Sequence, residues 1–294
     1  MFYNDQFIDY LRFQKRSSIY TIQSYETDLN QFIDFCHSID KTINSPEIDY
    51  RIIRKWIIEL LDNEISARSV NRKISTLKSY FKFLIKEGYV AKSPLNKILS
   101  SKTKKKLPAF VEENQFLELF DIIEFEAGYM GQRNKMIMDL FYRTGIRKSE
   151  LINLKDKDVD IKNMTIKVHG KRDKERLIPF TRQFIRQIQE FRATRDLEYP
   201  QHHEFFFVGS KGTKLYDKEV YRIVHKYLSL VTSITKKSPH VIRHTFATHM
   251  LNHGADLNAI KEILGHANLA ATQVYTHNSF EKLKSVYKKA HPRA

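Results

Sequence analysis

Six residues scattered along the chain have side chains that bind, protonate or attack a phosphate. They are Arg147, Lys171, His240, Arg243, His266 and Tyr275. Attack by a phenol on a phosphodiester adds negative charge to a centre that is already anionic. Guanidinium groups stabilise that charge well, because they donate paired hydrogen bonds and do not lose their protons. The set therefore predicts breakage of a DNA strand through a phosphotyrosine.

The segment S-P-H-V-I-R-H-T-F-A-T-H-M-L, residues 238–251, predicts a helix whose first turn favours an anion. Ser238 is a favoured N-cap and Pro239 a favoured first helical residue. His240 and Arg243 are three positions apart and so share one face of this helix. Unpaired backbone N–H groups at a helix N-terminus also attract an anion. A phosphate is therefore expected at this end of the helix.

Three further motifs complete an ordered series. In T-G-I-R-K-S-E-L, residues 144–151, Gly145 ends one helical run and Arg147 stands at the start of the next. L-G-H-A follows at 264–267, and Q-V-Y-T-H at 273–277. This series resembles the catalytic domain of the tyrosine recombinases, and specifically the Xer-type site-specific recombinases. The likeness extends over nearly the whole chain.

The resemblance implies a role for each of the six residues. Tyr275, one of 15 tyrosines, is implied as the nucleophile that forms a 3′-phosphotyrosine and frees a 5′-hydroxyl. Lys171 is implied as the general acid for that oxygen. From the residues alone its loop is ambiguous, because Arg172 is also basic, and the family more often has a small residue at that position.

The remaining roles concern the phosphate itself. Arg147 and Arg243 would hold it from two sides, His240 would orient it and take the phenolic proton, and His266 would donate a hydrogen bond to a non-bridging oxygen. Glu150, three residues after Arg147, is expected to be structural, holding that arginine or a nearby backbone group. Because the bond energy is kept in the phosphotyrosine, neither ATP nor a metal nor another cofactor is expected.

Composition agrees with a folded, DNA-binding protein. Among 294 residues, 41% are hydrophobic, which is enough for real cores. The 50 Lys and Arg against 34 Asp and Glu give a charge of +16 and predict a broad basic surface suited to polyphosphate. Cys36 is the only cysteine, which excludes an intramolecular disulfide and a Cys-based zinc site. The N-terminus reads neither as a signal peptide nor as a membrane span, so a cytoplasmic, nucleoid-associated protein is expected.

The apolar spacing predicts a mainly α fold with a small antiparallel sheet, divided in two. Residues 1–99 read as a bundle of four amphipathic helices, the third starting at Ser45-Pro46 and the fourth capped by Ser66. Residues 100–108 read as a basic linker and 109–294 as an α+β catalytic domain. The resemblance implies that the first domain is a SAM-like core-binding domain. The candidates for DNA backbone contacts are Arg68, Arg72, Lys73, Lys78, Lys104 and Lys105.

Within residues 109–294, V-D-I-K-N-M-T-I-K-V predicts a hairpin that turns at Lys162-Asn163, and R-L-I-P predicts a third short strand. Helices are expected to dominate from there to the end. Polar residues expected as their N-caps are Asp217, Ser238, Asp256 and Ser279. In Xer-type proteins the last helix docks into a neighbouring protomer, which implies a homo- or hetero-tetramer on a double-stranded recombination site. From the residues alone, docking on its own domain is equally open.

Two other function classes compete with this interpretation. His240 with His244, and His249 with His253, are each four apart, as in helical metal sites, but no carboxylate or cysteine completes a set. A metal-dependent nuclease is therefore less favoured, and no metal is expected. A DNA-binding protein that has lost its chemistry is also less favoured, since all six active positions hold competent residues. Chromosome dimer resolution and mobile-element integration both remain open, although the lack of an arm-binding domain before Met1 favours the simple Xer-like architecture.

Overall fold

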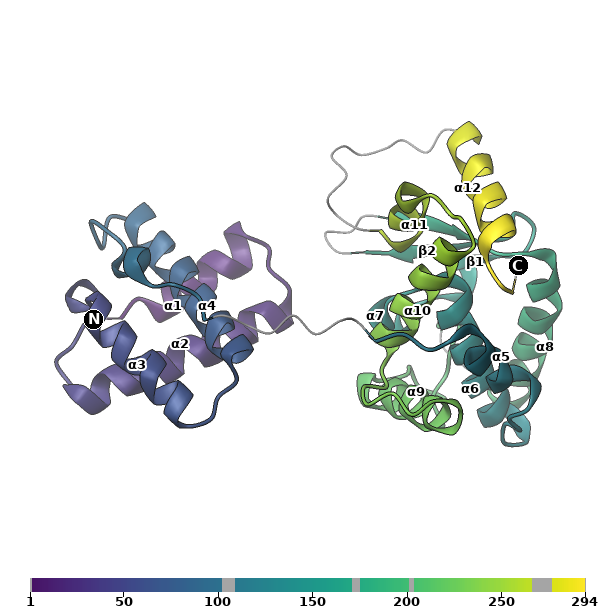
Figure 1. The fold of residues 1–294 in the computed structure, drawn as a ribbon, viewed down its shortest axis with the longest axis horizontal. Helices are drawn as coiled ribbons and strands as arrows, with labels where there is room; N and C mark the ends of the chain where they lie inside the picture. Colours follow the sequence, from purple (N-terminus) through teal and green to yellow (C-terminus); the bar gives the residue numbers. More distant parts are fainter. Residues whose placement is uncertain (1, 102–108, 171–174, 201–203, 266–276, 294) are drawn as a thin grey trace. The chain divides into compact units, whose positions relative to one another are not determined.

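The protein, seen in a computed structural model, consists of two compact units, Met1–Lys106 and Leu107–Ala294 (Figure 1). The structure describes residues 2–101, 109–170, 175–200, 204–265 and 277–293, with side chains from residue 280 onward in the last range. Each unit has a core of its own. The fold is mainly helical with one three-stranded antiparallel sheet, which confirms the predicted class.

The N-terminal unit is a bundle of amphipathic helices around Phe32, Trp56 and Leu77. Its elements are α1 (Asn4–Asp9), the π-helical turn η1 (Tyr10–Gln14), α2 (Ile19–Ile39), the 3₁₀ turn η2 (Ser45–Glu47), α3 (Tyr50–Asp62), α4 (Ala67–Lys86) and the 3₁₀ turn η3 (Pro94–Lys97). Ser66 caps α4 as predicted, because its hydroxyl accepts a hydrogen bond from the backbone N of Ser69 at 3.3 Å.

The third helix begins later than the sequence suggests. Ser45 starts the separate turn η2, and α3 begins only at Tyr50. The true cap is Asp49, whose carboxylate accepts hydrogen bonds from the backbone N of Arg51 and Ile52 at 2.8 and 3.0 Å. A stronger cap four residues downstream therefore sets the start of α3.

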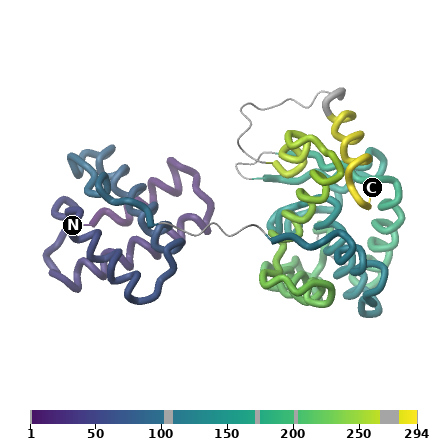
Figure 2. Tube along the Cα trace, in the orientation of Figure 1, coloured from purple at the N-terminus to yellow at the C-terminus, as the bar shows by residue number. Residues whose placement is uncertain are grey.

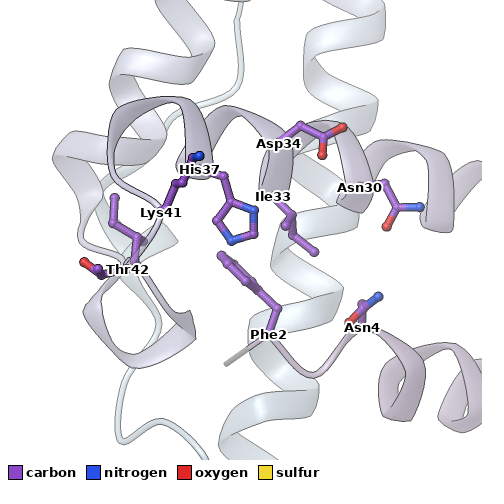
Figure 3. A pocket seen from close by; sticks show the side chains of 9 residues that line it. Phe2, Asn4, Asn30, Ile33, Asp34, His37, Lys41 and Thr42 are labelled. Atoms are coloured by element: carbon purple, nitrogen blue, oxygen red, sulfur yellow. The ribbon is translucent and has the colours of Figure 1, made fainter.

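The start of the chain packs against α2 beside a small hollow (Figure 3). The ring of Phe2 meets the ring of His37 edge-on, with 5.5 Å between centroids, and Tyr3 stacks on Tyr89 at 3.8 Å. None of the predicted site residues lines this hollow. These contacts anchor the N-terminus to the bundle.

The C-terminal unit is built around α6, whose side chains are buried along most of its length. Its elements are α5 (Glu113–Asp121), α6 (Gly128–Thr144), α7 (Lys148–Ile152), the 3₁₀ turn η4 (Asp156–Asp158), β1 (Val159–Asp160), β2 (Thr165–His169), β3 (Glu175–Pro179), α8 (Arg182–Glu198), α9 (Asp217–Val231), α10 (Pro239–Asn252), α11 (Leu257–Leu264) and α12 (His277–Ala290). α6 packs against α8, α9 and α10 (Figure 2). No helix in the described ranges is long and apolar enough to cross a membrane.

The predicted hairpin and third strand are confirmed. The strands are ordered β1-β2-β3 and every neighbouring pair is antiparallel. Val159 pairs with Ile166, and Ile166 in turn pairs with Ile178. Alternate residues thus face the core, as a period of two requires.

The four predicted caps of this unit have different outcomes. Asp256 caps α11, because its carboxylate accepts hydrogen bonds from two backbone N–H groups at 2.9 and 3.1 Å. Ser238 occupies the N-cap position of α10, but its buried hydroxyl has no hydrogen-bond partner in the described part of the chain. Asp217 and Ser279 are not caps, since α9 begins at Asp217 itself and α12 begins earlier, at His277.

In the single chain the C-terminal helix packs on its own domain, and docking in trans stays a prediction. Leu283 and Tyr287 are buried, and α12 contacts α10 and β3 (Figure 1). Just beyond the helix, His291 Nε2 donates a hydrogen bond to the carbonyl oxygen of Tyr142 at 3.0 Å. The apolar side chains of this helix pack into a groove of the same chain.

Candidate phosphate-binding site

Arg147 is placed by a sharp turn between α6 and α7. Gly145 ends α6 in the left-handed conformation, with φ +56°, as the sequence predicts. A Cβ there would lie 2.6 Å from Leu264 Cδ2 and 2.7 Å from Phe246 Cδ1, so only glycine fits without a shift. Ile146 then enters the core, and Arg147 becomes the residue before α7. The turn fixes where Arg147 stands relative to α10 and α11.

Arg243 reaches the same turn from α10. It is only 8% exposed, and its two terminal nitrogens donate hydrogen bonds of 2.6 Å to the carbonyl oxygens of Gly145 and Leu264. Burial, followed by the charges of Arg147 and Arg176, lowers the pKa of Arg243 to about 9. The group therefore stays charged at neutral pH among other positive charges, and an arriving anion would relieve their repulsion.

Three arginines converge on three consecutive carbonyl oxygens, those of the last two residues of α11 and of its C-cap Gly265. Arg176 Nε donates to Ile263 O at 2.6 Å, Arg243 to Leu264 O at 2.6 Å, and Arg147 to Gly265 O at 2.7 Å. Carbonyl groups at a helix C-terminus lack partners within the helix and attract cations, so this is a stable place to gather guanidinium groups. The next residue in the chain is His266.

Glu150 is the carboxylate at the centre of this cluster, and its expected structural role is confirmed. It accepts hydrogen bonds from the backbone N and the guanidinium of Arg147, at 2.9 and 2.6 Å. It also accepts two bonds of 2.8 Å from Arg176. Burial alone would raise the pKa of Glu150, but these bonds and the charge of Arg176 outweigh it and lower the pKa to about 2. The carboxylate is therefore ionised at neutral pH.

His240 lies on the first turn of α10, three positions before Arg243, as the sequence predicts. Its side chain is exposed. Partial loss of hydration, followed by the positive charges of Arg243, Lys236, Lys148 and Arg147, lowers the pKa of His240. The imidazole is thus kept neutral at physiological pH, in the form that accepts a proton.

Five candidate residues lie outside the residues that the structure describes: Lys104, Lys105, Lys171, His266 and Tyr275. Their assigned roles remain predictions. In the sequence, Lys171 lies between β2 and β3. His169 at the end of β2 pairs with Glu175 at the start of β3.

The DNA-contact candidates on α4 have different surroundings. Arg68, Arg72 and Lys78 are exposed, and Arg72 also bonds the buried carboxylate of Asp28. Lys73 is only 5% exposed, and its ammonium lies 3.1 Å from the same carboxylate. We therefore leave Lys73 out of the proposed DNA surface, because its charge is used inside the bundle.

Arg176 is the part of the cluster that sequence reasoning missed. It is 5% exposed. A signal for it is present in the sequence: Arg176 shares its strand face with Ile178, which predicts an inward-pointing arginine. A buried arginine requires a carboxylate partner, and Glu150 supplies it.

The second histidine pair proposed for a metal is engaged in the fold. His249 is buried, with one ring nitrogen 2.8 Å from the Tyr142 hydroxyl and the other 3.0 Å from the carbonyl oxygen of Val111. His253 instead bonds the carboxylate of Glu113 at 2.8 Å. Within the described ranges, no group of three His, Cys, Asp or Glu side chains could hold a metal ion.

Comparison with known proteins agrees with this geometry. Residues 109–282 match the phage integrase family, and residues 5–88 match the phage integrase N-terminal SAM-like domain. Tyrosine recombinase XerC of Oceanobacillus iheyensis is 38% identical over 296 residues, covering 99% of this chain and 96% of the relative. XerC of Bacillus licheniformis is 36% identical over 293 residues, covering 98% and 95%.

Solved structures show the same likeness. The XerH site-specific recombinase bound to palindromic difH substrate, in a post-cleavage complex, is 25% identical with a TM-score of 0.72, covering 96% of this chain and 83% of that one. The chain belongs to the phage integrase family. Within that family it is a tyrosine recombinase, and the comparisons support Xer-like site-specific recombination.

Proposed function

We propose that this chain breaks and rejoins DNA at a specific duplex site through a 3′-phosphotyrosine at Tyr275. One observation carries the proposal: Arg147 and Arg243 meet at the end of α11, directly before His266. The two positive charges thus meet at the residues that precede, in sequence, the segment containing His266 and Tyr275, which supports a shared site. XerH was solved on a DNA substrate, which supports a DNA duplex as the partner here.

In the proposed reaction the phenolic oxygen of Tyr275 attacks the phosphorus, and the bond from phosphorus to the 5′-oxygen breaks. His240 takes the phenolic proton, and Lys171 gives a proton to the leaving oxygen. Arg147 and Arg243 balance the charge that builds on the non-bridging oxygens, with His266 donating a further hydrogen bond. A 5′-hydroxyl from a partner duplex then reverses these steps and joins the exchanged strand through a Holliday junction.

We also propose that the active assembly is a tetramer linked by exchange of α12. The groove that holds Leu283 and Tyr287 in the single chain would receive the same helix from a neighbour, so each contact is preserved while subunits become joined. The Xer likeness favours resolution of chromosome dimers in the cytoplasm, hence a part in chromosome partition and cell division, ahead of mobile-element integration. Sequencing the genomic DNA that becomes covalently attached to the protein would test this choice.

The test of the chemistry is covalent capture. The wild-type protein is mixed with a nicked duplex of its recombination site, from which the cleaved end diffuses away, and protein-linked DNA is read on a denaturing gel. Tyr275→Phe should bind the duplex but give no linked DNA, whereas Tyr221→Phe, at an exposed tyrosine of α9, should behave as wild type. A wild-type protein that binds but never links to DNA would instead support a silent DNA-binding protein.

A further inference from the structure

Glu150 is shared by two arginines, and only one of them is a proposed phosphate ligand. Its Oε1 accepts hydrogen bonds from both guanidinium groups, at 2.6 Å from Arg147 and 2.8 Å from Arg176. Its Oε2 accepts from the backbone N of Arg147 and again from Arg176. Both oxygens of this buried carboxylate are thus fully used, and Arg176 takes the bidentate position.

The sharing has an electrostatic consequence for Arg147. If Glu150 had Arg147 as its only partner, the two opposite charges would form a pair with no net charge, and this pair would attract a phosphate only weakly. With Arg176 included, two guanidinium groups and one carboxylate leave one positive charge. Arg176 is 5% exposed while Arg147 is partly exposed, so the surplus charge lies on the solvent-accessible side of the cluster.

Arg176 is also fixed to the end of α11, independently of Glu150. Its Nε donates to the carbonyl oxygen of Ile263 at 2.6 Å, and a Cβ at Gly265 would lie 3.0 Å from its Cδ. Gly265 O, two residues after Ile263, accepts a hydrogen bond from Arg147 at 2.7 Å. One buried side chain thus bonds both Glu150 and the end of α11, the two places to which Arg147 is bonded. Because Arg176 lies in β3, the sheet fixes the backbone from which this side chain extends.

We propose that Arg176 is a positioning residue for strand cleavage: it balances the charge of Glu150 and so leaves the charge of Arg147 available to the scissile phosphate. The proposal rests on the proposed recombinase function. Arg176 itself need not touch DNA. It acts through Glu150 and the end of α11, and its effect should therefore depend on the charge of the phosphate.

The experiment compares two suicide duplexes, one with a normal scissile phosphate and one with a methylphosphonate, which lacks the negative charge that Arg147 balances. On the normal duplex, Arg176→Gln should slow formation of protein-linked DNA by about 10²-fold, like the loss of one charge-stabilising donor. On the methylphosphonate the same variant should react nearly as fast as wild type. The double variant Arg176→Gln with Glu150→Gln should recover most of the normal rate, since the summed charge of positions 147, 150 and 176 returns to +1, as in the wild type.

Several controls keep the outcome readable. Arg186→Gln, at an exposed arginine of α8 paired with Glu190, should change neither rate. Thermal unfolding checks each variant, and Arg176→Lys, which keeps the charge, should retain more activity than Arg176→Gln. Equal slowing on both duplexes without recovery in the double variant would show that Arg176 only maintains the fold, and would overturn the proposal.

A binding measurement separates this proposal from the recombinase function. The dependence of duplex affinity on salt should weaken by about 0.9 in log–log slope in Arg176→Gln, equivalent to one phosphate contact, and return in the double variant. If the wild-type protein never links to DNA, the proposed function fails. The salt dependence of binding then decides by itself whether Arg176 leaves the charge of Arg147 available to a DNA phosphate. An unchanged slope in Arg176→Gln would refute the inference.

Discussion

Arg243 and Gly145 are 98 positions apart in the chain, yet the arginine donates a 2.6 Å hydrogen bond to the carbonyl oxygen of the glycine. That glycine is also the residue that lets α6 end in a left-handed turn and places Arg147 two residues later. One backbone position therefore locates both proposed phosphate-binding arginines. Damage to the turn should damage the site.

Gly145→Ala should destabilise the C-terminal unit by roughly 2–5 kcal/mol. The left-handed backbone costs a residue with a side chain about 1–2 kcal/mol, and the new methyl group overlaps Leu264 and Phe246, which adds about 1–3 kcal/mol. Gly88→Ala is a matched control, because Gly88 has φ +78° but no atom within 4 Å of the added carbon. Chemical unfolding measures both, and equal losses would contradict the packing argument.

The sequence predicted what local patterns determine. The β1–β2 hairpin follows from alternation around a turn, and Gly145, Ser66 and Asp256 end or cap their helices where expected. The cluster at the end of α11 is different, because it depends on which carbonyl groups the tertiary fold presents to Arg176. No spacing within one segment contains that information.

Two further features depend on tertiary contacts in the same way. The sequence predicts Lys73 as part of a basic helix face. In the structure its ammonium instead pairs with the buried carboxylate of Asp28 on a different helix. The amphipathic stripe of α12 predicts that the helix needs a groove, and the stripe alone does not say which chain provides it. Both outcomes are decided by contacts between segments far apart in sequence.

Asp28→Ala should destabilise the N-terminal unit by about 3–5 kcal/mol, because it leaves the buried ammonium of Lys73 without its carboxylate. Lys73→Met should cost less, since Arg72 still pairs with Asp28. If Lys73 is structural, Lys73→Met should leave the salt dependence of duplex binding unchanged. Arg68→Gln, at an exposed position of the same helix, should weaken the log–log slope by about 0.9. A change of slope with Lys73→Met would return that residue to the DNA surface.

Strand cleavage should persist at mildly acidic pH, because the pKa of His240 is lowered and its neutral form accepts the phenolic proton. As pH falls, the rate should drop only when His240 becomes protonated, below the usual range for histidine. Lys236→Gln removes one of the charges that lower this pKa, so the acid limb of the rate profile should move to higher pH. Lys226→Gln, whose ammonium pairs with Glu126, is the control. NMR titration of His240 in the free protein checks the same shift without DNA.

Lys171→Ala should slow cleavage of normal DNA by about 10²–10⁴-fold, as loss of a general acid does. The defect should largely disappear on a duplex with sulfur in place of the 5′-bridging oxygen, because a thiolate leaves without protonation. Arg147→Ala should gain nothing from the sulfur. Recovery with Arg172→Ala in place of Lys171→Ala would transfer the acid role to the neighbouring residue.

The packing of α12 changes what a C-terminal truncation should do. If α12 served only to link subunits, a chain ending at Asn278 would fold, bind one site and fail only in assembly. The structure predicts a loss of stability as well, because Leu283 and Tyr287 belong to the core. Tyr287→Ala should cost about 3–5 kcal/mol. Tyr287→Phe should cost little, since that hydroxyl is buried with no hydrogen-bond partner in the described part of the chain.

A peptide of residues 277–294 can test whether the α12 groove accepts the helix in trans. Added to the truncated chain, it should raise the unfolding temperature toward that of the full chain, because His291 would again donate to the carbonyl oxygen of Tyr142 and Leu283 would refill its site. The Tyr287→Ala peptide should rescue poorly. If the wild-type peptide binds, the groove is competent for a neighbour's helix, and sedimentation of the truncated chain on paired sites should show no tetramer until α12 is supplied on another chain. Failure of the peptide to bind, in a truncated chain that remains folded, would contradict exchange of α12 between subunits.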